Sequence, residues 1–149
     1  MLFGKKKRNI VRLLLVEDEP LIAFDNEHFL TEAAYTIVAT VDRVADALAI
    51  IANSTDTEGN AEIDLVLVDV HLANGSGLDV ARAAQARGVP VMFVTGNFPD
   101  EAMALATGCL AKPYAPRDLI GAIAVIDARI GGATPKRLPP GFRLFATLT

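Results

Sequence analysis

The chain has 149 residues, enough for one domain with a substantial core and too few for most two-domain enzymes. Apolar residues make up 52% of it and charged residues 21%, a composition typical of folded globular proteins rather than disordered ones. All 18 acidic residues lie within residues 13–130 beside only 6 basic ones, so this segment repels nucleic-acid phosphates and favours a bound metal cation.

The two ends of the chain differ from this acidic middle. Residues 1–9 are predicted to form a basic N-terminal extension, residues 10–130 the folded domain, and residues 131–149 a flexible tail without helical periodicity. A single cysteine, Cys109, is typical of a reducing cytosol. The longest apolar run, residues 119–126, is far shorter than the roughly 18 residues of a membrane span, so we expect a cytoplasmic protein without membrane contact.

Five short runs are predicted to form strands; Val, Ile and Leu dominate the first four, which show little polar alternation, as is typical of strands buried on both faces of a parallel sheet. They cover residues 11–16, 36–41, 63–68, 90–95 and 109–111. Helical patterns follow them at residues 20–33, 43–52, 78–87, 99–106 and 115–130. This alternation predicts an α/β fold with a doubly wound, five-stranded parallel sheet of strand order 2-1-3-4-5, the flavodoxin-like arrangement.

The first helix begins with a proline, and the acidic residues before it favour the positive end of the helix dipole. Its apolar spacing predicts one face that packs on the sheet. That face is formed by Leu21, Phe24, His28 or Phe29, and Ala33.

Polar side chains interrupt the apolar pattern where strands end. They are Glu17 and Asp18 after the first strand, Asp69 after the third, Thr95 at the end of the fourth and Lys112 after the fifth. Open α/β sheets bind ligands at the carboxyl ends of their strands, and the first and third strands flank the point where the strand order reverses. The three acids are therefore expected to meet in one crevice.

Three carboxylates in one crevice repel one another unless a cation compensates their charge. Oxygen ligands with open water positions favour Mg²⁺. Lys112 adds a fixed positive charge and Thr95 a hydroxyl group, so the same crevice suits an anion beside the metal, and a phosphoryl group is the natural occupant. An aspartate carboxylate is then able to act as a nucleophile and form an aspartyl phosphate.

Five short motifs stand at these strand ends and turns. They are Leu15-Val16-Glu17-Asp18-Glu19-Pro20, Val68-Asp69-Val70-His71-Leu72, Gly75-Ser76-Gly77-Leu78, Val94-Thr95-Gly96 and Ala111-Lys112-Pro113-Tyr114. In this order they resemble the response-regulator receiver domains of two-component signalling, over about residues 10–130. The resemblance implies that Asp69 accepts a phosphoryl group. It also implies a Mg²⁺ site formed by Glu17, Asp18, Asp69 and the backbone carbonyl of His71.

The resemblance further implies that Thr95 binds the phosphoryl group and moves with it, and that Lys112 pairs with it and precedes a cis peptide bond to Pro113. Receiver domains usually carry a Tyr or Phe three residues before this lysine, and its ring rotates with the threonine; here Cys109 occupies that position. The segment before the lysine is also short by about one helical turn. We therefore expect a stunted fourth helix, and we expect the loop of residues 96–101 and the short helix after it to carry the conformational change.

The run Phe93-Val94-Thr95-Gly96 is similar to the motif of the FAT GUY group of single-domain regulators, which lack that aromatic residue. The sequence thus predicts a single-domain response regulator without a DNA-binding output domain, which is not an enzyme acting on a separate substrate. Its expected partners are a sensor histidine kinase or histidine phosphotransfer protein, and an unidentified downstream protein.

Two alternatives remain open. One is a binding module that keeps only the fold, and the complete set of acids, threonine and lysine counts against it. The other is a hydrolase that forms an aspartyl phosphate from small substrates. That chemistry needs a second aspartate just after the nucleophile, and here His71 occupies the place two residues on.

Overall fold

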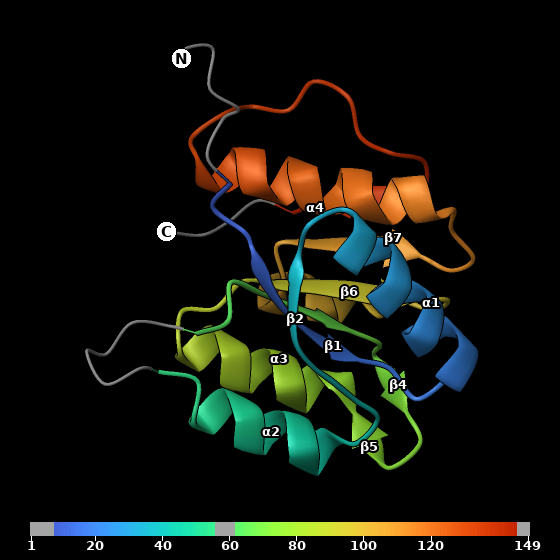
Figure 1. Ribbon diagram of the computed structural model, residues 1–149, viewed down its shortest axis with the longest axis vertical. Coiled ribbons are helices and arrows are strands. Elements are labelled where there is room, and N and C mark those ends of the chain that lie inside the picture. The colour runs from blue at the N-terminus through green and yellow to red at the C-terminus, as the bar shows by residue number, and fades with distance from the viewer. Residues whose placement is uncertain (1–7, 56–61, 146–149) are drawn as a thin grey trace.

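The computed structural model describes residues 8–55 and 62–145. Residues 1–7, most of the predicted basic extension, lie outside the described residues. A central sheet is covered by helices on both faces, with α4 on one side and α2 and α3 on the other (Figure 1). None of the helices in the described part of the chain is long and apolar enough to cross a membrane.

The sheet contains five parallel strands in the predicted order. Along the chain they are β1 (Arg12–Val16), β2 (Thr36–Val41), β3 (Leu65–Val68), β6 (Val91–Thr95) and β7 (Gly108–Ala111). Across the sheet they lie in the order β2-β1-β3-β6-β7, followed at the edge by a further strand, β8 (Phe142–Leu144). The doubly wound prediction is confirmed, and Val16 at the end of β1 pairs with Val68 at the end of β3.

The connecting elements lie close to the predicted ranges. They are α1 (Pro20–Glu32), α2 (Val44–Ala52), α3 (Gly77–Ala86), the 3₁₀-helix η1 (Asp100–Leu105) and α4 (Pro116–Ile130). A small hairpin of β4 (His71–Leu72) and β5 (Gly75–Ser76) follows β3. The prediction of a stunted fourth helix is confirmed, because η1 has 6 residues and 3₁₀ geometry.

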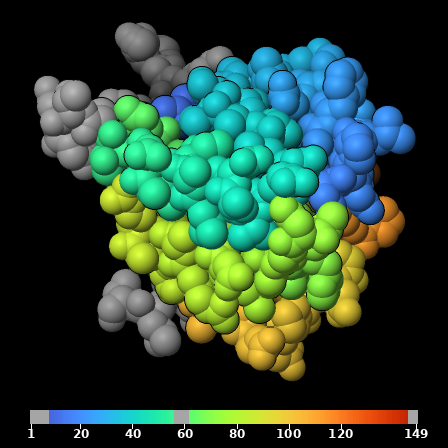
Figure 2. All heavy atoms as spheres, turned by 90° about the horizontal axis from the view of Figure 1, so that it is seen from below, coloured from blue at the N-terminus to red at the C-terminus, as the bar shows by residue number. Residues whose placement is uncertain are grey.

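Successive residues of each strand point to opposite faces of the sheet and build two cores. In β1, Leu14 and Val16 pack with α2 and α3, whereas Leu13 and Leu15 pack with α1 and α4. Figure 2 shows α2 and α3 lying side by side over the first of these faces. Since both faces are covered, β3 and β6 consist of buried apolar residues apart from Thr95.

The predicted apolar face of α1 is wrong. Leu21 and Phe24 are 79% and 72% exposed, whereas Asn26 and Leu30 are buried. Apolar side chains occur all around this helix, so their spacing does not single out one face. The orientation comes from tertiary contacts instead, because Leu30 packs into the core and Asn26 accepts a hydrogen bond from Tyr114.

The predicted flexible tail of residues 131–149 is wrong for residues 142–145. Residues 142–144 form β8, which runs antiparallel to β7. Phe142 and Phe145 are 5% and 4% exposed and belong to different cores. Their spacing of three residues places the rings on opposite faces of an extended chain, and so short a segment shows no periodicity in the sequence.

Gly108 allows this close approach of β8. A Cβ atom at residue 108 would lie 2.7 Å from two ring atoms of Phe142 and 2.8 Å from the carbonyl oxygen of Arg143. We expect Gly108→Ala to displace β8 and to lower the free energy of unfolding by about 1–3 kcal/mol, as overpacking a core does. Urea unfolding measures this loss. The control is Gly96→Ala, whose Cβ would meet no atom within 4 Å, and equal losses in the two variants would contradict the tight contact.

Candidate functional site

Four strands bring the predicted site residues to one edge of the sheet. Glu17 follows β1, Asp69 follows β3, Thr95 ends β6 and Lys112 follows β7. Backbone hydrogen bonds set their positions: the Asp69 N–H donates to the Val16 carbonyl at 3.2 Å, and the Lys112 N–H to the Thr95 carbonyl at 3.0 Å. Glu17, Asp69 and Thr95 are 6%, 8% and 2% exposed, so the site is largely shielded from water.

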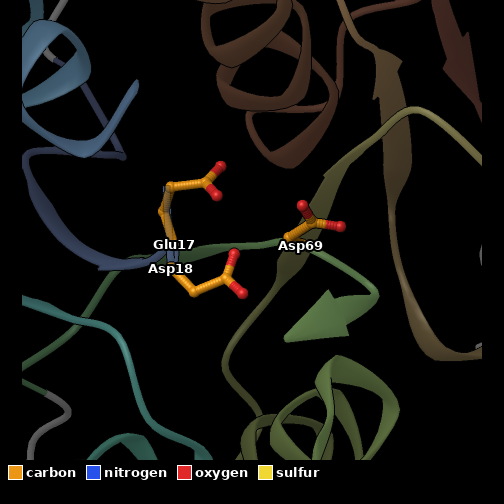
Figure 3. Close-up of side chains that lie close together, drawn as sticks. All are labelled: Glu17, Asp18 and Asp69. Atoms are coloured by element: carbon orange, nitrogen blue, oxygen red, sulfur yellow. The ribbon is translucent and has the colours of Figure 1, made fainter. Parts of the chain in front are cut away.

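Three carboxylates gather at this edge, as the sequence predicts. One ligand oxygen from each of Glu17, Asp18 and Asp69 lies within 4.8 Å of the others. Figure 3 shows Glu17 and Asp18 on adjacent positions after β1, with Asp69 facing them from the neighbouring strand. An all-oxygen donor set of this kind matches the preference of Mg²⁺, which takes one or two carboxylates and keeps several waters. The donors present therefore fit the predicted ion.

The ammonium group of Lys112 lies among the carboxylates. Its Nζ is 2.7 Å from Glu17 Oε1, 2.8 Å from Asp69 Oδ2 and, nearer the surface, 3.3 Å from Glu19 Oε2. Burial lowers the pKa of Lys112, but the hydrogen bonds and charges of Asp69 and Glu17 outweigh burial and raise its pKa overall. The lysine is therefore a permanent positive charge inside the site.

Burial of the Glu17 carboxylate is unfavourable for its charged form. Desolvation raises its pKa, and the hydrogen bonds from Lys112 and from the backbone of Glu19 offset only part of this rise. The side chain of Asp18, by contrast, is only partly buried. Since burial disfavours the charged form, a cation held beside Glu17 and Asp18 would stabilise both carboxylates.

Thr95 is turned toward the loop that follows it. Its hydroxyl donates to the carbonyl of Asn97 at 3.2 Å and accepts from the N–H of the same residue at 3.3 Å. Asn97 is only 2 residues from Thr95 in the sequence, so these hydrogen bonds close a local turn and do not join Thr95 to another strand. The hydroxyl can serve another acceptor only by leaving Asn97.

Asp69 is positioned by the residues that follow it. The N–H of His71 donates to Asp69 Oδ1 at 3.1 Å, which leaves Oδ2 for Lys112. The His71 residue is exposed, and the role predicted for its carbonyl oxygen stays a prediction. Gly77 packs directly against Asp69, where a Cβ atom would lie 1.9 Å from the Asp69 carbonyl oxygen. Gly77 belongs to one of the sequence motifs, but no role was predicted for it. A glycine at the start of a predicted helix was the feature that could have indicated this close packing.

Two polar contacts near the site were missed from the sequence. Glu19 reaches Lys112, and the acidic run before α1 was the available signal. The Tyr114 hydroxyl donates to Asn26 Oδ1 at 2.8 Å, and burial raises the pKa of Tyr114, so the phenol stays protonated as a donor. Residues 26 and 114 are far apart in the chain and no motif pairs them. The Lys112–Pro113 peptide bond is cis, as predicted.

Comparison with known proteins agrees with this geometry. Residues 13–124 match the family model described as response regulator receiver domain. The chain is 31% identical over 121 residues to the phyllosphere-induced regulator PhyR of Methylorubrum extorquens, covering 74% of this chain and 41% of that protein. It is 34% identical over 125 residues to the sensory transduction protein RegX3 of Mycobacterium tuberculosis, covering 80% and 52%. The chain thus spans about half the length of these curated relatives.

Solved structures show the same architecture. A CheY-like receiver domain protein from Methanospirillum hungatei superposes with a TM-score of 0.69 at 24% identity, over 83% of this chain and 98% of that one. The response regulator PhyR from Brucella abortus superposes with a TM-score of 0.65 at 26% identity, over 85% and 51%. With the family match, the strand order and the carboxylates gathered around one lysine, the chain belongs to the response regulator receiver domains of two-component signalling.

Proposed function

We propose that the chain accepts a phosphoryl group on Asp69, with Mg²⁺, from the phosphohistidine of a sensor histidine kinase or a histidine phosphotransfer protein. It then signals through altered contacts with a downstream protein. The observation that carries the proposal is the Lys112 ammonium, 2.8 Å from Asp69 Oδ2 and 2.7 Å from Glu17 Oε1 in a shielded site. Phosphoryl transfer consists mainly of positioning and charge stabilisation, and this arrangement supplies both.

Asp69 is held for attack on phosphorus. One of its oxygens accepts the His71 N–H and the other faces Lys112. An Asp69 oxygen forms a bond to phosphorus while the bond from phosphorus to the donor imidazole nitrogen breaks, and the electron pair of that bond stays with the imidazole. Lys112 then pairs with a phosphoryl oxygen, and the Thr95 hydroxyl leaves Asn97 to donate to another.

The metal would be held by Glu17, Asp18, Asp69 and the backbone carbonyl of His71. Bound there, Mg²⁺ supplies positive charge against the negative charge that builds up on the phosphoryl oxygens. Asp18 is the ligand most open to solvent among the three acids, which suits an ion that keeps several waters.

The two other functions have less support. A hydrolase needs an acid–base side chain next to the reacting group, whereas His71 is exposed and contacts Asp69 through its backbone N–H. A module that only binds partners does not need Lys112 partly buried between two carboxylates, because withdrawing such charges from water costs free energy. We therefore propose that the chemistry of the chain is limited to its own phosphorylation and dephosphorylation.

The wider setting rests on sequence predictions. Action as a single-domain regulator, without a DNA-binding output domain, stays a prediction, because the curated relatives extend well beyond the matched region. A cytoplasmic location stays a prediction as well.

Replacement of Asp69 by asparagine tests the phosphorylation site. Asn keeps the shape of the side chain and removes the nucleophile. We expect the wild-type chain, incubated with a small phosphodonor and Mg²⁺, to gain about 80 Da, one PO₃H group, and Asp69→Asn to gain nothing. Intact-mass spectrometry measures the gain, and circular dichroism checks that the variant stays folded.

The matched control is Asp79→Asn, which changes an exposed carboxyl group on α3 and should label like the wild type. Labelling of Asp69→Asn at the wild-type rate would show that the acceptor is another residue. A wild-type chain that gains no mass would favour the binding module, and continuous release of phosphate from small substrates would favour the hydrolase.

The metal site makes a second prediction. Mg²⁺ should raise the melting temperature of the unphosphorylated chain, because it relieves the repulsion among Glu17, Asp18 and Asp69. At ten times its Kd a ligand stabilises the folded state by about 1.4 kcal/mol. Asp18→Ala should remove the Mg²⁺-dependent shift in a thermal melt. Glu32→Ala, which removes an exposed carboxylate at the other end of α1, should retain it; a shift that persists in Asp18→Ala would place the ion elsewhere.

A further inference from the structure

β8 closes the edge of the sheet beside β7, beyond the residues 13–124 that match the receiver-domain family. The Phe145 N–H donates to the Thr107 carbonyl at 2.8 Å, and the Ala111 N–H donates to the Gly141 carbonyl at 2.9 Å. Two backbone hydrogen bonds that flank the strand thus hold it in place. β8 lies beyond the residues that match the receiver-domain family, and a 3-residue strand at the edge of a sheet opens at a lower free energy than the central strands do.

An aromatic contact joins β8 to the loop after β6. The Phe145 ring stacks on Phe98, with centroids 5.3 Å apart and planes 19° apart. The Phe98 ring also packs against the ring of Phe93 in β6, with centroids 5.7 Å apart. The Arg143 guanidinium lies 5.4 Å from the centre of the Phe145 ring and 5.9 Å from that of Phe98. Phe98 therefore contacts both Phe145, which follows the edge strand, and Phe93 within β6.

The backbone just before Phe98 is held by the Thr95 hydroxyl. That hydroxyl exchanges two hydrogen bonds with Asn97, the residue next to Phe98. A movement of the hydroxyl away from Asn97 breaks both bonds. Phe98 therefore directly follows the backbone groups that the Thr95 hydroxyl holds.

Cys109 leaves room for this arrangement. It is buried in the same core as Phe93 and Phe145, and Phe98 packs against that core. Burial raises the pKa of its thiol to about 11, so the side chain is a small neutral packing group at physiological pH. The ring that receiver domains usually carry at this position is absent here, and the core beside β7 contains Phe93 and Phe145.

We propose that β8 is a displaceable strap, and that the Phe98–Phe145 stack couples its docking on β7 to the position of the Thr95 hydroxyl. The proposal rests on the proposed phosphorylation of Asp69. When the hydroxyl turns to a phosphoryl group, the bonds to Asn97 break, Phe98 shifts from Phe145, and β8 leaves β7 more often. Release uncovers the backbone edge of β7. Because coupling is reciprocal, release of β8 in turn favours the state in which the Thr95 hydroxyl points toward the phosphoryl group.

The first experiment needs no phosphorylation. Thr95→Val keeps the shape of the side chain and removes the hydroxyl. Amide hydrogen exchange of the full chain, followed by NMR, should show the N–H groups of Phe145 and Ala111 exchanging about fivefold to thirtyfold faster than in the wild type, the factors expected for loss of one and of both hydrogen bonds to Asn97. The N–H of Val66, bonded to Pro90 inside the sheet, should keep its rate and so exclude general destabilisation.

Two further variants test whether faster exchange in Thr95→Val comes from loss of the aromatic stack. Phe98→Leu keeps an apolar side chain and removes the stack, so it should accelerate exchange at Phe145 and Ala111 as Thr95→Val does. Ser54→Ala is the matched control, because it deletes another buried hydroxyl hydrogen bond, to Ile51, at a distance from β8. It should leave both amides at the wild-type rate.

The second experiment adds a small phosphodonor and Mg²⁺ and follows intact mass and amide exchange together. Mass gain with faster exchange at Phe145 and Ala111 supports the strap. If the chain gains mass without faster exchange at these two amides, or if they exchange at wild-type rates in Thr95→Val, the strap proposal is wrong and the proposed function is unaffected. Absence of any mass gain overturns the proposed function instead, and the coupling within the chain is then judged by Thr95→Val and its Ser54→Ala control.

Discussion

A partly buried ammonium group that pairs with two carboxylates organises the end of the molecule that contains the site. Lys112 follows β7, Glu17 follows β1 and Asp69 follows β3, so the pairing exists only when these strands lie in their observed order and register. Because removal of one partner would leave an uncompensated buried charge, the arrangement strongly favours this alignment of strand ends. The same charges make the site ready for an anion and a divalent cation, which is the chemistry that receiver domains use.

Close backbone contacts at two glycines position the elements next to the site and at the edge of the sheet. Gly77 lets the start of α3 pack against the Asp69 backbone, and Gly108 lets β8 pack against β7. A Cβ atom at either position would overlap its neighbour, so both glycines act through the space they leave empty. The first contact positions Asp69, the proposed phosphoryl acceptor, and the second adds a strand whose aromatic side chain stacks on Phe98 in the loop after Thr95.

The parts that could be predicted are those with a strong local pattern. Four apolar runs with little polar alternation indicated strands buried on both faces, and polar residues such as Asp69 and Lys112 at strand ends indicated the site edge. The face of α1 could not be predicted in this way, because apolar residues surround the helix and the buried Asn26 depends on Tyr114.

The sequence by itself determined the α/β class, the strand order and the residues that gather at the site, because strand and helix periodicity and the meeting of strand ends follow from local patterns and general topology. Only the tertiary structure decided which face of α1 is buried, that Glu19 reaches Lys112, and that residues 142–144 form a strand. Each of these depends on contacts between distant parts of the chain. The pairing of Phe145 with Phe98 shows the reason, since the burial of each ring depends on a partner 47 residues away that no local pattern identifies.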